Sequence, residues 1–167
     1  ANRSELVESM RRSLQFMRAG GTGAFLEFRE GGTEGVEVLF DAVDAVDIEP
    51  VVFGREDTDV LEIADGFGAS GARDDDFSAE RTTTRQANKL FGIHAGERDA
   101  DDINPALDLD PDFVVHMVHP EPIHFERLDD KETPVVVCPR SNLVTNVGVP
   151  PVADLLERTK VALGTDN

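Results

Sequence analysis

The sequence has no run of eighteen apolar residues, so no segment of it is long enough to cross a membrane as a helix. Residues 1–17 also lack the basic start, apolar block and small-residue cleavage site of a secretory signal. These absences argue against a membrane-spanning or secreted protein and favour a cytoplasmic one. With 167 residues and 40% hydrophobic content, the chain can form a sizeable core, and we expect one domain over residues 1–167.

Positive charge is also scarce. Lysine and arginine together number 16 against 34 acidic residues, which gives a formal net charge of -18. This balance argues against nucleic acid or an anionic membrane as a partner, because neutralising phosphates requires clustered basic side chains. We interpret the acidic excess as the solvated surface of a protein from a salt-adapted organism, since salt screens the repulsion between carboxylates. The alternative is an acidic face that attracts a cationic partner.

Cysteine occurs once, as Cys138 in the apolar run of residues 134–138, so no disulfide framework exists. We expect Cys138 to be a small buried hydrophobic residue rather than a nucleophile. Histidine occurs four times. One of them, His124, falls on a predicted helix, where we expect it to be solvated.

Segments with apolar residues at helical spacing alternate with short, near-continuous apolar runs. The predicted helices cover residues 5–20, 34–46, 56–64, 77–90, 101–109, 121–130 and 150–159. The predicted strands cover residues 23–28, 48–54, 65–70, 90–95, 112–118, 133–138 and 161–165. The sequence therefore predicts seven strands that alternate with seven helices.

This alternation is typical of a parallel sheet covered by helices. An open doubly wound sheet is one possibility, but no G-x-G-x-x-G turn or Walker lysine follows the first predicted strand. A (β/α)8 barrel instead places polar functional residues just after many different strands. Such residues here are Arg29, Glu30, Arg55, Ser70, Arg73, His94, Glu97, His116, His119, Arg140, Asn142 and Asp166. We therefore predict an incomplete (β/α)8 TIM barrel of parallel strands.

Three strand ends carry side chains that suit metal-dependent hydrolysis, although each of them alone could be structural. His94 and Glu97 are three residues apart, so one can bind a metal while the other reaches water or substrate. Strand alternation sends His116 and His119 to different sides, and we favour His116 for the barrel mouth. Asp166 directly follows a buried strand, where a carboxylate is costly unless a metal or hydrogen bonds compensate it.

Four motifs in this order and spacing carry a resemblance to a known family: GIHAGE, VVHMVHP, VVVCPRSNL and VALGTDN. They resemble strands five to eight of the amidohydrolase superfamily, in its adenosine/cytosine deaminase and chlorohydrolase-like branch. The resemblance is strong over residues 89–167, and residues 23–32 and 49–55 are similar to strands two and three. It implies strands two to eight of the barrel, a small-molecule substrate and one divalent metal, zinc or alternatively iron.

The resemblance also implies roles for individual residues. His94 would be a metal ligand, and Glu97 would carry a proton to the leaving nitrogen. His116 would orient or polarise, and Asp166 would be both a metal ligand and the base for the hydrolytic water. The candidate substrate-binding residues are Arg29, Glu30, Arg140, Ser141, Asn142 and His119.

The chain departs from that family because it contains no H-x-H, the pair of ligands that the family's first strand contributes. We expect those ligands to lie upstream of Ala1, in the remainder of a longer chain, and the 167-residue chain itself to be inactive and to bind zinc weakly or not at all. Residues 65–70 contain no lysine, so we expect one metal rather than two bridged by a carbamylated lysine.

These inferences predict the core of a metal-dependent amidohydrolase that cleaves a C–N bond, by deaminating an amino-substituted ring or by opening a cyclic amide. The rival interpretation is a non-catalytic barrel fragment whose unpaired strand edges make it a self-associating or partner-binding module. Unpaired edges also predict a homo-oligomer unless a longer chain covers them. Metal content distinguishes the two interpretations.

The charge balance generates one test. Repulsion among the excess carboxylates should make the melting temperature rise steeply between low and molar salt. Thermal unfolding followed by circular dichroism over a series of KCl concentrations measures this. A melting temperature that stays flat across the series would contradict the salt-adapted interpretation.

Overall fold

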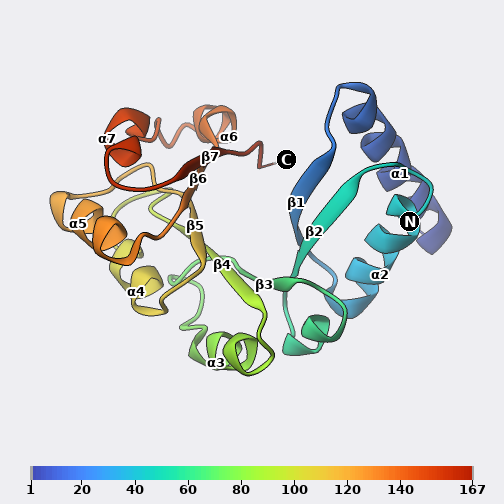
Figure 1. Ribbon diagram of the computed structural model, residues 1–167, viewed down its shortest axis with the longest axis horizontal. Coiled ribbons are helices and arrows are strands. Elements are labelled where there is room, and N and C mark those ends of the chain that lie inside the picture. Colours follow the sequence, from blue (N-terminus) through green and yellow to red (C-terminus); the bar gives the residue numbers. More distant parts are fainter. Residues whose placement is uncertain (1, 167) are drawn as a thin grey trace. The chain divides into compact units, whose positions relative to one another are not determined.

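The computed structural model describes residues 2–166, and its seven strands lie in one sheet in the order of the chain (Figure 1). The strands are β1 (Ala24–Arg29), β2 (Glu49–Gly54), β3 (Gly66–Ala69), β4 (Leu90–Ala95), β5 (Phe113–His116), β6 (Val135–Val137) and β7 (Val161–Leu163). All pairs with a defined register are parallel. The predicted α/β fold of an incomplete (β/α)8 barrel is therefore confirmed.

The helices are α1 (Arg3–Ala19), α2 (Gly32–Val43), α3 (Ser78–Gln86), α4 (Ile103–Asp108), α5 (Pro122–Lys131), α6 (Pro139–Val144) and α7 (Val152–Leu156), with a 3-10 helix η1 (Thr58–Glu62). Every predicted helix is present, but the one expected over residues 56–64 is the 3-10 helix. Helix α6 was not predicted. Over residues 2–166, none of the helices combines the length and the apolar character that crossing a membrane requires.

The chain divides into two compact units, the first of which comprises Ala1–Gly68 and Thr83–Lys89. In this unit α1 and α2 lie side by side next to β1 and β2, whose register runs from Ala24↔Glu49 to Arg29↔Gly54 (Figure 1). The buried side chains between these elements are Leu14, Val36, Leu39, Ala42, Ile48 and Val52. Parallel pairing and helix packing together form a core for this unit.

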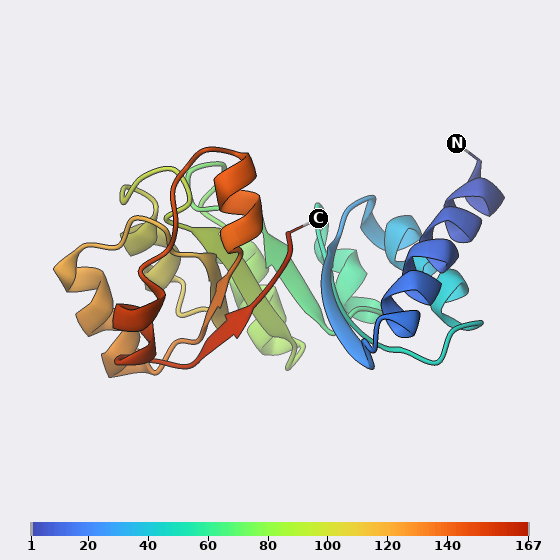
Figure 2. The same cartoon turned by 90° about the horizontal axis from the view of Figure 1, so that it is seen from above.

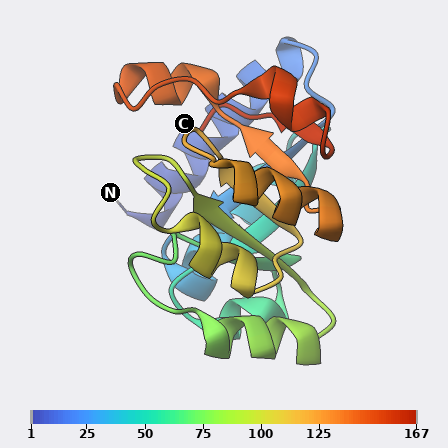
Figure 3. The same ribbon diagram turned by 90° about the vertical axis from the view of Figure 1, so that its left-hand side faces the viewer.

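The second unit comprises Ala69–Thr82 and Leu90–Asn167 and contains strands β4 to β7. Helices α4 and α5 lie side by side in it, as Figures 2 and 3 show. Its fully buried side chains include Phe91, Ile93, Ile103, Val114, Leu128, Val135 and Leu155. Because β4, β5, β6 and β7 are parallel neighbours, their carboxyl ends meet at one edge of the sheet in this unit.

The expectation that His124 is solvated is wrong, because only 1% of this residue is exposed. His124 lies in the first turn of α5, and its Nδ1 accepts a hydrogen bond of 2.9 Å from the backbone N–H of Glu121. The ring therefore takes the place of a capping side chain at the start of the helix. Burial lowers the pKa of His124, which keeps the ring neutral and able to accept.

Helix α7 provides a matched test of the core. Leu155 is fully buried, whereas its neighbour Leu156 is 60% exposed on the same helix. We expect Leu155→Ala to lower the free energy of unfolding by about 2–5 kcal/mol, because it leaves a cavity. Leu156→Ala should change it by less than about 0.5 kcal/mol. Urea unfolding of both variants measures this, and equal losses would place the core elsewhere.

Candidate active site

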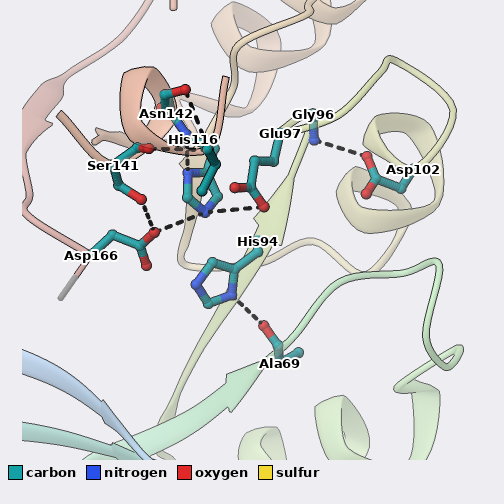
Figure 4. Close-up of polar contacts among 10 residues, drawn as sticks. Ala69, His94, Gly96, Glu97, Asp102, His116, Ser141, Asn142 and Asp166 are labelled. Carbon is teal, nitrogen blue, oxygen red and sulfur yellow. Dashed lines mark hydrogen bonds and ion pairs between the residues drawn. The ribbon is translucent and has the colours of Figure 1, made fainter. Parts of the chain in front are cut away.

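Two histidines meet at the carboxyl ends of β4 and β5 (Figure 4). The parallel register pairs His94 with Val115 and Ala95 with His116, so the two histidines stand one step apart on neighbouring strands. Their ring centroids are 5.2 Å apart, at an interplanar angle of 37°. Both predicted strand-end histidines therefore belong to one cluster.

A backbone carbonyl determines which ring nitrogen of His94 is available. Nδ1 of His94 lies 2.9 Å from the carbonyl oxygen of Ala69. A carbonyl oxygen can only accept a hydrogen bond, so Nδ1 carries the proton and donates it. Nε2 of the neutral ring therefore presents a lone pair. This is the arrangement in which a metal-binding histidine is usually held.

His116 is 2% exposed and its backbone is left-handed, with φ 79°. This region is uncommon for residues other than glycine, although histidine adopts it more readily than most. Two backbone hydrogen bonds hold the chain immediately after it. The N–H of Met117 donates to the carbonyl of Ala95 at 3.0 Å, and that of Val118 donates to Gly96 at 2.8 Å. The strand end at His116 is therefore fastened to the end of β4 in spite of its strain.

Glu97 reaches the cluster from a tight turn after β4. Gly96 has φ 67°, and a Cβ atom built on it would lie 2.8 Å from a side-chain carbon of Ile103, so the turn requires glycine. Its N–H donates a 2.8 Å hydrogen bond to Oδ1 of Asp102. Oε2 of Glu97 then lies 3.9 Å from Nε2 of His116. The turn thus directs a half-buried carboxylate toward the imidazole (Figure 4).

Asp166 comes from the segment after β7. Its Oδ2 lies 3.9 Å from Nε2 of His116 and accepts a hydrogen bond of 2.6 Å from the hydroxyl of Ser141 on α6. The hydroxyl fixes the orientation of a carboxylate that is otherwise on the surface. Nε2 of His116 therefore faces two carboxylates, those of Glu97 and Asp166 (Figure 4).

Among residues 2–166, one group of histidine, cysteine and acidic side chains has the geometry to hold a metal ion, and it consists of His94, His116 and Asp166. One ligand atom from each of the three lies within 4.8 Å of the others. Two imidazole nitrogens and a carboxylate oxygen are a donor set that suits zinc or iron. The residues present therefore fit a divalent metal. Sequence reasoning had counted His94 and Asp166 as ligands and had given His116 an orienting role.

The candidate substrate-binding residues occupy different environments. Asn142 is fully buried beside His116, whereas Arg140 is exposed on the same helix. His119 is exposed, and its Nε2 bonds to the carbonyl oxygen of Val147 at 2.8 Å.

Arg29 and Glu30 belong to the first unit. Arg29 pairs there with Glu27 at 3.0 Å, and Glu30 pairs with Arg55 at 3.3 Å. Their assignment as substrate-binding residues stays a prediction.

Sequence reasoning missed Asp102, which holds the Gly96 turn and so positions Glu97. Asp102 occupies the N-cap of α4, yet its side chain makes no capping hydrogen bond to that helix and is directed to the turn instead. An aspartate before a helix normally predicts a cap. The only available signal was the short spacing between the Gly-Glu pair and this aspartate.

No family model matches the chain. A curated protein of Archaeoglobus fulgidus named "Putative aminohydrolase" is 38% identical over 166 residues, which cover 97% of this chain and 49% of the relative. A protein of the same name from Methanothermobacter thermautotrophicus is 32% identical over 193 residues, which cover 97% of this chain and 50% of the relative. The chain thus spans about half the length of the curated relatives it matches.

Solved structures match almost the whole chain. An adenine deaminase from Arthrobacter aurescens aligns with a TM-score of 0.79 at 17% identity and covers 99% of this chain and 63% of its own. The N6-methyl-AMP deaminase of Arabidopsis thaliana aligns with a TM-score of 0.81 at 15% identity, and the alignment covers 99% of this chain and 63% of the deaminase chain. The atrazine chlorohydrolase of Arthrobacter aurescens, complexed with zinc, aligns with a TM-score of 0.77 at 15% identity. This alignment covers 95% of this chain and 48% of the chlorohydrolase chain.

The fold is an incomplete parallel α/β barrel, and two histidines and two carboxylates lie together at or just beyond its strand ends. Both comparisons support the predicted resemblance: the chain is homologous to curated proteins named aminohydrolase, and it shares its fold with an adenine deaminase and an atrazine chlorohydrolase.

Cys138 reports on the electrostatics beside this cluster. Burial, and then the negative charges of Asp166 and Glu97, raise the pKa of its thiol from 9.0 to about 11. At pH 9 about half of an ordinary thiol is ionised, compared with about 1% of Cys138, and only the thiolate reacts. We therefore expect alkylation by iodoacetamide at pH 9 to be at least about 50-fold slower in the folded chain than in urea. Equal rates would restore Cys138 as a candidate nucleophile.

Proposed function

We propose that the chain is the core of a metal-dependent hydrolase that cleaves C–N bonds, with His94, His116 and Asp166 as metal ligands and Glu97 as the proton carrier. One observation supports this proposal above all. Ligand atoms from three separate segments, β4, β5 and the segment after β7, lie within 4.8 Å of one another. Side chains so distant in sequence converge in this way most readily where a ligand is bound.

A divalent cation bound there would lower the pKa of water and polarise the substrate, as it does in other metal hydrolases. The chain's own residues would handle the protons. Asp166 takes one proton from the attacking water at its carboxylate, and the Ser141 hydroxyl keeps that carboxylate in place. Glu97 delivers one proton to the leaving nitrogen as the C–N bond breaks and the C–O bond forms. The net reaction adds one water across the bond.

The substrate class follows from the relatives and remains a proposal. Their names include an aminohydrolase and an adenine deaminase, and one neighbour is an atrazine chlorohydrolase. Their common chemistry is displacement of a group from a nitrogen-containing ring by water. We infer that this chain acts on an amino-substituted ring, with ammonia as the leaving group.

Metal binding is the first experiment. The two ligands expected from the sequence, His94 and Asp166, predict weak binding, but His116 adds a third ligand at the same place, so we expect measurable binding of zinc. Competition with a chromophoric chelator should show that His94→Ala and His116→Ala lose most of the affinity. His119→Ala is the matched control, since its ring bonds to Val147, and it should bind zinc as the unmodified chain does. Equal affinity in all four proteins would contradict the ligand assignment.

Activity is the second experiment. The 167-residue chain and the product of its complete gene, both loaded with zinc, are assayed for ammonia release from aminopurines, aminopyrimidines and aminotriazines. Glu97→Gln should lower the rate by about 10²- to 10⁴-fold, because it removes a general acid. It should leave zinc affinity unchanged, since Glu97 is not a proposed ligand. Full activity in Glu97→Gln would remove its proposed role.

A further inference from the structure

Asn142 on α6 is fully buried, and its side-chain amide contacts His116 (Figure 4). Nδ2 of Asn142 lies 3.0 Å from Nδ1 of His116. The other end of the amide, Oδ1, is buried and has no hydrogen-bond partner among residues 2–166. Both polar atoms of a buried amide usually form hydrogen bonds. Here the only hydrogen bond of the side chain within residues 2–166 goes to His116, which indicates that the amide acts on this ring.

The backbone of Asn142 is fixed, whereas its amide is held on one side only. The backbone N–H donates to the carbonyl of Cys138 at 3.0 Å, and the carbonyl accepts from Val147 N–H at 3.0 Å and from the Thr145 hydroxyl at 3.3 Å. In the side chain, no bond to Oδ1 within residues 2–166 opposes an exchange of Oδ1 and Nδ2 by a half turn. The contact with His116 therefore decides the orientation of the amide.

The two orientations require different tautomers of His116. When Nδ2 faces the ring, it donates to the lone pair of Nδ1, and the ring proton lies on Nε2. When Oδ1 faces the ring, it accepts from Nδ1–H, and Nε2 carries the lone pair. Nε2 faces the carboxylates of Glu97 and Asp166, both at 3.9 Å, so without a cation the N–H form is favoured.

We propose that Asn142 is a positioning residue that holds the His116 ring in either of its two tautomers, by donating to Nδ1 without a metal and accepting from it with one. The part of this inference that concerns the metal-bound state rests on the proposed function. His94, His116 and Asp166 would hold a cation with Nε2 of His116 as the ligand atom, so the one ring proton would lie on Nδ1 and the amide would turn Oδ1 toward it.

This role differs from the pocket-lining role that the resemblance implied for Asn142. A side chain with no exposed surface touches substrate only through its neighbours, and the polar neighbour here is His116. Aspartate, which only accepts, and leucine, which does neither, are matched replacements of similar size. They separate a tautomer effect from a packing effect.

The first test is the tautomer of His116 in the metal-free chain. Two-dimensional ¹H–¹⁵N spectra of the imidazole rings, recorded at about pH 8.5, where histidine is ordinarily neutral, show which nitrogen carries the proton. We expect the proton on Nε2, with a scalar coupling across the hydrogen bond from Asn142 Nδ2 to His116 Nδ1. A proton on Nδ1 in this sample would overturn the proposal.

The second test is the Asn142→Asp variant, whose carboxylate must accept. We expect His116 to carry its proton on Nδ1 before any metal is added. Leu143→Ala is the control, because Leu143 is the next residue on α6 and is 62% exposed, and it should leave the tautomer on Nε2. An unchanged tautomer in folded Asn142→Asp would contradict the proposal. If that variant does not fold, the coupling in the unmodified chain decides.

Zinc affinity completes the experiment. Asn142→Leu should lower the affinity by about 10- to 100-fold, since Nδ1–H then has no acceptor, whereas folded Asn142→Asp should keep it. Equal losses in the two variants would indicate a packing role and overturn the proposal. Absence of zinc binding in the unmodified chain would count against the proposed function alone, because the metal-free tautomers of the unmodified chain and of Asn142→Asp would still decide the role of Asn142.

Discussion

The candidate site depends on a break in the pleat at the end of β5. Residues paired across a parallel register point to the same face, and side chains alternate along a strand. A fully extended backbone would therefore place His116 on the face of Ala95, its register partner, and leave His94 on the other face. The left-handed φ of 79° at His116 ends this alternation, and the two rings come within 5.2 Å. Such a conformation costs about 1–3 kcal/mol, and it persists because hydrogen bonds from Met117 and Val118 fasten the following residues to the end of β4.

Most of the fold was predictable because strands buried in a parallel sheet appear as apolar runs, and all seven were recognised. Helix α6 was missed for a physical reason. Among its six residues only Asn142 is buried, so there is no apolar stripe with helical spacing to reveal it. Its start carries a proline in the first turn but no side-chain cap. Yet α6 supplies Ser141 and Asn142, which contact Asp166 and His116. A helix without a hydrophobic face cannot be recognised from the spacing of apolar residues in the sequence.

The candidate site residues were predictable one by one, but their arrangement was not. The position of His94, Glu97, His116 and Asp166 after apolar runs placed them at strand ends. The geometry of the cluster comes from contacts that no local pattern shows, such as the carbonyl of Ala69 behind His94 and the amide N–H of Gly96 on Asp102. Simple alternation along β5 also gave no indication of a left-handed residue. Long-range backbone contacts therefore hold the information that sequence patterns lack.

Two negative charges lie beside His116, and they also affect the neighbouring Cys138. Glu97 and Asp166 both approach Nε2 at 3.9 Å, and no lysine or arginine within residues 2–166 is paired with either carboxylate. The Cys138 thiol responds to the same field, since both carboxylates contribute to the increase of its pKa. Two like charges that approach one imidazole are favourable only if positive charge lies between them. A proton on Nε2 supplies part of that charge, and a divalent cation among His94, His116 and Asp166 would supply more. The buried amide of Asn142 can hydrogen-bond to His116 in either case, because an amide is both a donor and an acceptor.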